Sequence, residues 1–286
     1  MRSRFPKYTL AGAAAALFSV VSLAAQSPIP QVAPQALVAE AVANALKDAD
    51  ARVPYLYRLD RKQLERSEAR DIVSTRDGLV ARTVAINGQP LTPQQRSLDD
   101  QRLDKLLADP KEQHKRRQQQ EKEAQRVRSM IRALPDAFLY EHDGIEPGKD
   151  GALVRLKFRP NPEFDPPTRE TLVYKGMEGH LWIHQHDGRI ARLDAVLVED
   201  VKLGWGLVAN LHKGGRFRLE QDKLADGRWQ TSQMTLDFTG RAFLFKSIKI
   251  KQEQSISNVR RVPDNLSLAE GIELLRKQNG EIAEKK

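Results

Sequence analysis

Residues 152–159, ALVRLKFR, and residues 179–194, GHLWIHQHDGRIARLD, belong to the stretch Ala152–Val262, whose pattern is the main indication of the fold. In the first segment Val154, Leu156 and Phe158 fall on one face of an extended chain, as the period of a β-strand requires. Similar runs recur along the stretch, separated by Asp-Gly, Gly-Gly or Thr-Gly pairs of the kind that close hairpins. They leave no room for a crossover helix, so the stretch predicts a long antiparallel meander.

The strands expected in this meander are Ala152–Arg159, Thr171–Gln185, Arg189–Val201, Arg216–Leu224, Arg228–Phe238 and Ala242–Arg260. The last of them begins with apolar residues at both parities, which predicts that something packs on both of its sides there. More polar strands of the same sheet are expected upstream, with turns at Asp77-Gly78 and Asn87-Gly88. These are Pro54–Leu59, Gln63–Thr75 and Leu79–Asn87.

The amino terminus indicates export. Arg2, Arg4 and Lys7 precede an uncharged run, Tyr8–Ala25, and Ser22-Leu23-Ala24 has the small residues that a signal peptidase requires. Residues 1–25 are therefore predicted to be a signal peptide cleaved near Ala24, which gives a periplasmic or secreted protein. A retained membrane anchor is the alternative, but the run is Ala-rich and close to the lower length limit for a span.

Composition restricts the chemistry further. The chain has no cysteine, which excludes disulfides, thiolate metal sites and lipid attachment through cysteine. Its net charge is +9, and removal of the three basic residues of the signal leaves +6. A mildly basic exported protein is compatible with contact to an anionic membrane surface. No nucleic-acid recognition motif is present, so nucleic acid is not expected as a partner.

Helices are predicted at three places. Gln35–Ala51 carries apolar residues at helical spacing, and a second helix begins at Thr92, where Gln95 can complete a capping box. That helical insert spans about 93–133 and is expected to break at Asp109-Pro110. A third helix is expected over Ser267–Gln278. The predicted organisation is a linker and helix over 26–51, a single antiparallel β domain over 52–262, and a helix and tail over 263–286.

The part of the insert after Pro110 is strongly charged, with eight Lys or Arg residues between Lys111 and Arg132. It could offer a basic face to anionic lipid or to an acidic envelope protein. It could equally be a solvated helix whose last turns, from Val127 to Leu134, dock on the sheet, because charge runs are usually solvated.

The sequence offers little catalytic chemistry. His180, His184 and His186 would share one face of a strand and could bind a divalent metal, but no carboxylate accompanies them at a diagnostic spacing. Asp194, Glu199 and Asp200 could act as acid–base groups, although carboxylates near Arg189 and Arg192 favour cross-strand ion pairs. Motifs for a nucleophile elbow, a zinc protease or a phosphate loop are absent. We therefore expect a non-enzymatic protein with no metal and no cofactor.

Aromatic residues are spread over successive strands, and a curved sheet could bring several onto one concave surface. They would then form either the ordinary core beneath a covering helix or the lining of a hydrophobic cleft. The candidate cleft residues are Trp182, Trp205, Phe217, Trp229, Phe238, Phe243 and Phe245.

The stretch Gly179–Asp194 resembles a hairpin of the periplasmic lipoprotein-carrier (LolA/LolB-like) superfamily. There a Gly-x-Leu-Trp-Ile strand is followed by a charged turn and an Ile-x-Arg-Leu strand. The same half-barrel appears in lipid-sensing regulators of anti-sigma factors, and the resemblance implies an open half-barrel whose concave face holds acyl chains under helices. Four further segments resemble a set of uncharacterised exported bacterial proteins: residues 87–91, 132–138, 175–179 and 237–242.

These patterns together predict an α+β, mainly β, fold: a curved antiparallel sheet, or open half-barrel, covered by helices. The predicted function is non-enzymatic binding of a hydrophobic or amphiphilic, lipid-like ligand or an envelope component. The alternative is an envelope scaffold with a filled core and no ligand cavity.

Overall fold

The computed structural model describes residues 32–203, 209–242 and 246–284. Within these ranges, thirteen strands form one antiparallel sheet. The strands are β1 (Tyr55–Gln63), β2 (Arg66–Thr75), β3 (Gly78–Ile86), β4 (Gln89–Pro90), β5 (Phe138–Gly148), β6 (Gly151–Pro160), β7 (Met177–His184), β8 (Arg189–Leu197), β9 (Val201–Leu203), β10 (Ala209–Leu211), β11 (Arg216–Lys223), β12 (Trp229–Ala242) and β13 (Lys246–Arg261). The helices are α1 (Pro34–Asp50), α2 (Pro93–Ala108), α3 (Pro110–Ala137), α4 (Leu268–Glu284) and the 3-10 helix η1 (Glu170–Gly176).

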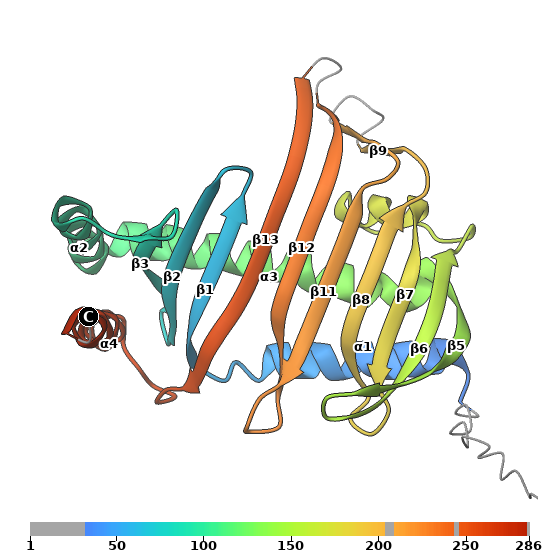
Figure 1. Ribbon diagram of the computed structural model, residues 1–286, viewed down its shortest axis with the longest axis horizontal. Coiled ribbons are helices and arrows are strands. Elements are labelled where there is room, and N and C mark those ends of the chain that lie inside the picture. The colour runs from blue at the N-terminus through green and yellow to red at the C-terminus, as the bar shows by residue number, and fades with distance from the viewer. Residues whose placement is uncertain (1–31, 204–208, 243–245, 285–286) are drawn as a thin grey trace, which may run out of the picture.

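The sheet is a meander in which the first and last strands of the chain meet. Its order is β4-β3-β2-β1-β13-β12-β11-β8-β7-β6-β5, and β10 pairs with β12 and β9. Strand β13 pairs with β1, so the polar upstream strands join the meander, as predicted. The end strands β4 and β5 do not pair, and the curved sheet stays an open half-barrel with helices packed on it (Figure 1). The predicted fold class is confirmed.

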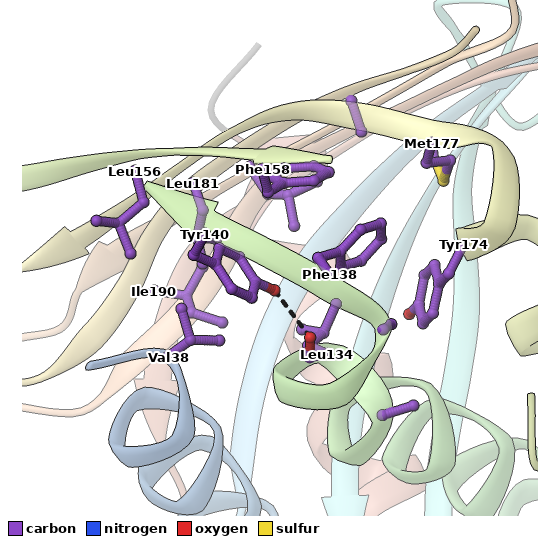
Figure 2. Packing of buried hydrophobic residues seen from close by; sticks show 14 of the residues in the cluster. Val38, Leu134, Phe138, Tyr140, Leu156, Phe158, Tyr174, Met177, Leu181 and Ile190 are labelled. Atoms are coloured by element: carbon purple, nitrogen blue, oxygen red, sulfur yellow. Dashed lines mark hydrogen bonds between the residues drawn. The ribbon is translucent and has the colours of Figure 1, made fainter. Parts of the chain in front are cut away.

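The main core lies on one face of the sheet, which we call the inner face; it carries Leu156, Leu181 and Leu197, all buried. Helices α1, α3 and η1 pack on this face over β5 to β8 (Figure 2). The hydroxyl of Tyr140 donates to the carbonyl oxygen of Leu134 at 2.9 Å, and that of Tyr174 donates to Met130 at 3.2 Å. These bonds attach the end of α3 to the sheet, and burial raises the pKa of both phenols.

A second core lies on the opposite, outer face, at the β1–β3 end of the sheet. Leu56, Val73 and Val80 alternate with the inner-face residues of their strands and pack against α2 and α4. Ile272 and Leu275 of α4 are fully buried there. Helices α2 and α4 therefore cover the outer face at this end of the sheet, whereas α1 and η1 cover the inner face at the other end. No helix in the described part of the chain combines the length and the apolar composition that a membrane span needs.

Helices α2, α3 and α4 begin at the capping residues that the sequence predicted. Thr92 and Gln95 form the capping box of α2, and the Asp109 carboxylate accepts from two amides at the start of α3. At α4, the Ser267 backbone N–H donates to the Glu270 carboxylate, and the Glu270 N–H donates to the Ser267 hydroxyl. The end of α3 was placed too early: the helix continues from Ala133 through Pro135 to Ala137.

Several strand predictions were wrong. The strand expected to end at Leu59 continues as β1 to Gln63, and the strand expected over Arg189–Val201 ends as β8 at Leu197. Strand β5 was not predicted, because Gly144 and Pro147 are typical of a loop; a register shift between His142 and Ile145 accommodates the irregular segment. The expected strand Thr171–Gln185 begins only at Met177, because the preceding apolar residues form η1 and pack against α3.

The expected strand Ala242–Arg260 is not one strand: Ala242 is the last residue of β12, and the residues from Lys246 onward form β13. Ala242 pairs with Lys246 across the antiparallel β12–β13 pair, so the chain reverses direction between them. Strand β12 runs through Gly240, where a Cβ atom would lie 2.3 Å from the carbonyl oxygen of Asn210. The glycine at position 240 therefore permits a close strand approach and does not mark a turn.

Candidate functional site

The candidate cleft aromatics do not gather at one place. Phe238 is buried in the inner core, and Phe217 packs partly buried against it. Trp182 belongs to a separate small cluster with Leu153 and Ala191, against which Trp229 packs. The remaining three, Trp205, Phe243 and Phe245, lie outside the described residues.

The two described tryptophans are held by polar partners. The indole N–H of Trp182 donates to Glu146 at 3.0 Å, and the guanidinium of Arg192 lies 4.9 Å from the centre of its ring. The indole N–H of Trp229 donates to Asp187 at 3.0 Å. Both rings therefore help to fasten strand ends and the β7–β8 turn together.

The three histidines do not form a metal site. Both ring nitrogens of His184 are occupied: Nε2 lies 3.0 Å from the carbonyl oxygen of Asp150, and Nδ1 accepts from the Asp187 backbone N–H at 3.1 Å. His180 pairs with Asp143 at 3.1 Å, and His186 lies exposed in the turn after β7, so the expected shared strand face does not include it. Within the described ranges, no group of three potential ligands could hold a metal ion.

The candidate acid–base carboxylates lie on β8 and in the segment between β8 and β9. Asp194 pairs with Arg218 of the neighbouring β11 at 2.7 Å, which is the cross-strand kind of ion pair that the sequence favoured. Asp200 accepts from the backbone N–H of Lys213 at 2.8 Å, and Glu199 is exposed. The three groups do not converge on a common point.

The charged helix α3 uses several of its arginines for docking. Arg116 donates to the carbonyl oxygen of Leu79 at 2.5 Å, and Arg117 pairs with Asp77 at 3.2 Å, so the first half of the helix binds the β2–β3 hairpin. Burial lowers the pKa of Arg116. Arg128 lies 3.5 Å from both Asp50 and Glu121. The helix is therefore attached at both ends, and not only at its last turns.

Beside the main core, the inner face carries a row of apolar side chains that are only partly buried, and two of them, Leu219 and Leu236, pack against the edge of that core. We call it the inner apolar row: Leu219, Met234, Leu236, Ile256 and Leu59. Leu219 lies opposite Met234 across β11 and β12, and Ile256 lies opposite Leu59 across β13 and β1. Helix α3 crosses this side of the sheet (Figure 1), with its main contacts at α2 and β3 on one end and at α1, β5 and η1 on the other. The row therefore lies on strands between the two regions where α3 is attached, and its side chains are less deeply buried than those of the main core.

A charged pocket adjoins this row at the β1–β2 hairpin. It has a volume of about 270 Å³ and is lined by Arg61, Gln63, Arg66, Glu68 and Arg70. Glu68 pairs with Arg66 at 2.6 Å and with Arg70. The Nε atom of Arg70 is buried without a hydrogen-bond partner. With three guanidinium groups against one carboxylate, the pocket is positively charged and can accept an anionic group.

This pocket was not predicted, because the expected strand Gln63–Thr75 runs through the actual turn at Leu64-Glu65 and because Arg61 falls outside both expected strands. A signal was present: Arg61, Gln63, Arg66, Glu68 and Arg70 follow strand alternation on either side of a two-residue turn, Leu64-Glu65, where Leu64 has a positive φ of 50°. The inner apolar row was missed for another reason. Its members come from four strands, and only the register brings them together.

Comparisons with known proteins give distant neighbours. No family model matches the chain, and no curated protein matches it. Among solved structures, a DUF1329 family protein from Desulfovibrio piger is 13% identical; the match covers 80% of this chain and 94% of that one, with a TM-score of 0.28. A putative outer membrane lipoprotein-sorting protein domain from Vibrio parahaemolyticus is 9% identical, with coverages of 84% and 99% and a TM-score of 0.29.

A third neighbour, MucB in complex with MucA(peri), is 10% identical, with coverages of 79% and 99% and a TM-score of 0.22. Similarity at this level does not establish a shared function, so the functional argument rests on the geometry of this chain.

Proposed function

We propose that this is a periplasmic or secreted, non-enzymatic protein that binds a lipid-like, amphiphilic ligand on the inner face of its sheet. The observation that carries the proposal is the inner apolar row, because apolar side chains in the middle of a large sheet are normally buried unless a ligand or partner covers them. The exported location rests on the predicted signal peptide, which lies outside the described residues.

The row and the charged pocket suit the two parts of an amphiphile. The apolar part would lie along Leu219, Leu236 and Ile256, where burial contributes roughly 25 cal/mol per Å² before the costs of association. The anionic end would lie near Arg61 and Arg70. Of the aromatic candidates, Phe217 adjoins the row because it lies opposite Leu236, so we include it in the proposed lining.

Filling the space over the row tests the proposal. Met234 points to the inner face and its neighbour Thr235 to the outer face, so Met234→Trp and Thr235→Trp add the same ring on opposite sides of one strand. For a fluorescent fatty-acid probe, we expect Met234→Trp to weaken binding by about tenfold or more, and Thr235→Trp to leave it within about twofold. Circular dichroism checks that both variants fold.

The alternative is an envelope scaffold with a filled core, and the dense packing around Leu156, Leu181 and Phe138 is the observation that favours it. Native mass spectrometry of protein purified from its own envelope separates the two functions. A co-purifying lipid supports the binding protein. A ligand-free mass, together with no probe uptake by the wild type, overturns the proposal in favour of the scaffold.

A further inference from the structure

Strand β13 has a free edge above the β1–β2 hairpin. Its pairing with β1 ends at Gln252, opposite Gln63, whereas its pairing with β12 continues to Lys246. In Figure 1, β12 and β13 accordingly extend beyond the tip of the hairpin. Within the described ranges, the segment Lys246–Ile250 therefore pairs on one side only.

The backbone groups on this edge can be assigned from one hydrogen bond. The N–H of Leu64 donates to the carbonyl oxygen of Lys251 at 3.1 Å, which shows that Lys251 directs its backbone toward the β1 side. Because this direction alternates along a strand, Lys249 and Ser247 direct their N–H and C=O groups to the same side. Beyond the hairpin tip, these groups form an unpaired template for another strand.

The side chains along the edge separate by face. Ile248 and Ile250 lie on the inner face, opposite Gly240 and Phe238, and Ile250 is 40% exposed. Lys249 and Lys251 lie on the outer face. They line an open pocket of about 910 Å³, together with the hairpin tip at Gln63–Arg66, Ile86, Asn87 and Gln95. A strand laid along the edge would thus meet the apolar side chains of Ile248 and Ile250 on one side, where Lys246 also lies at the end of the edge, and the lysines at 249 and 251 on the other.

We propose that this edge binds an extended acidic segment of another protein by strand addition. The occupant would alternate apolar residues, which cover Ile248 and Ile250, with acidic residues, which pair with Lys249 and Lys251. Strand pairing with a second copy of this edge is disfavoured, because it would bring several lysines close together. The recognised element is about five residues long, since the hairpin tip ends the free edge.

A labelled peptide of alternating Glu and Val residues tests the proposal with the mature protein. Ser247→Pro removes an outward N–H but none of the hydrogen bonds between β12 and β13, and edge positions of this kind tolerate proline. Ser247→Ala is the matched control because it keeps the N–H. By fluorescence anisotropy, we expect about a tenfold loss of affinity for Ser247→Pro and less than a twofold change for Ser247→Ala.

Two further measurements separate strand pairing from simple charge attraction. A peptide N-methylated at alternate residues lacks the backbone N–H groups on the edge that would pair with β13, so it should bind the wild-type protein more weakly than the parent peptide. This comparison does not depend on how well Ser247→Pro folds. A peptide of Glu and Gly with the same charge should bind weakly. Equal binding of the parent, N-methylated and Glu-Gly peptides would overturn the proposal, since it would show attraction to lysines without strand pairing.

Discussion

At the scale of single residues, Asp187 shows how one carboxylate fastens several elements. The ammonium group of Lys223 lies 2.8 Å from it, the indole N–H of Trp229 donates to it at 3.0 Å, and its backbone N–H donates to His184. The hydrogen bond from Lys223, with that from Trp229, lowers the pKa of the carboxyl group. The ionised form is therefore favoured in the folded protein.

This lowered pKa predicts a pH dependence. A group with a depressed folded-state pKa contributes stability that is complete above its ordinary pKa of about 4 and is lost as the pH falls through the folded value. Asp187→Asn should therefore lower the free energy of unfolding by about 1 kcal/mol at pH 7. The difference in free energy of unfolding between wild type and Asp187→Asn, measured by urea denaturation, should shrink below pH 4. A gap that stays constant with pH would show that the charge of Asp187 contributes nothing.

The aromatic candidates mark the limit of prediction at this scale. Alternation predicted the inner positions of Val154, Leu156 and Phe158, because β6 is regular. The same reasoning could not place Trp182 and Trp229 relative to Phe217. Register shifts at Trp182/Ile183 and at Glu220/Gln221 change which residues face one another, and a bulge leaves no clear trace in a sequence.

At the scale of elements, local chemistry predicted where helices begin better than where they end. The capping box at Thr92 needs only residues three positions apart, and the structure contains it. The end of α3 depends on a distant group: the Tyr140 hydroxyl bonds the carbonyl oxygen of Leu134 and so stabilises the last turn beside Pro135. Strand β5, to which Tyr140 belongs, was not predicted, so no sequence pattern indicated that the helix extends to Ala137.

The capping box gives the prediction at this scale. Thr92→Ala removes the hydroxyl that accepts from the Gln95 N–H and should lower the free energy of unfolding by about 1 kcal/mol. Thr92→Ser retains the acceptor and should stay close to wild type. Chemical denaturation measures both changes, and hydrogen exchange should show the loss of protection in the first turn of α2. Equal stability of the two variants would mean that the cap contributes nothing measurable.

At the scale of the whole molecule, the sheet joins two cores that share no buried residue. Ile272 belongs to the outer core beneath α4, and Leu181 belongs to the main core beneath α1 and α3. The pairing of β1 with β13 connects the two regions. The turn pairs Asp77-Gly78 and Asn87-Gly88 predicted that the upstream segments are strands of this sheet. Sequence alternation could not predict two cores on opposite faces, because it shows which residues share a face but not which face a helix covers.

This arrangement predicts separable local stability. Ile272 is fully buried and Leu181 is almost fully buried, so replacing either with alanine leaves a cavity. Each substitution should lower the free energy of unfolding of the core that contains it by about 2–5 kcal/mol. In hydrogen exchange, Ile272→Ala should reduce protection in β1, β2, β3 and α4 while β6 and β7 stay close to wild type. Leu181→Ala should show the reverse pattern. If either variant instead lowers protection evenly across the whole sheet, the β1–β13 pairing must couple the two cores into one cooperative unit, and ligand binding on the inner row would then stabilise the outer core as well.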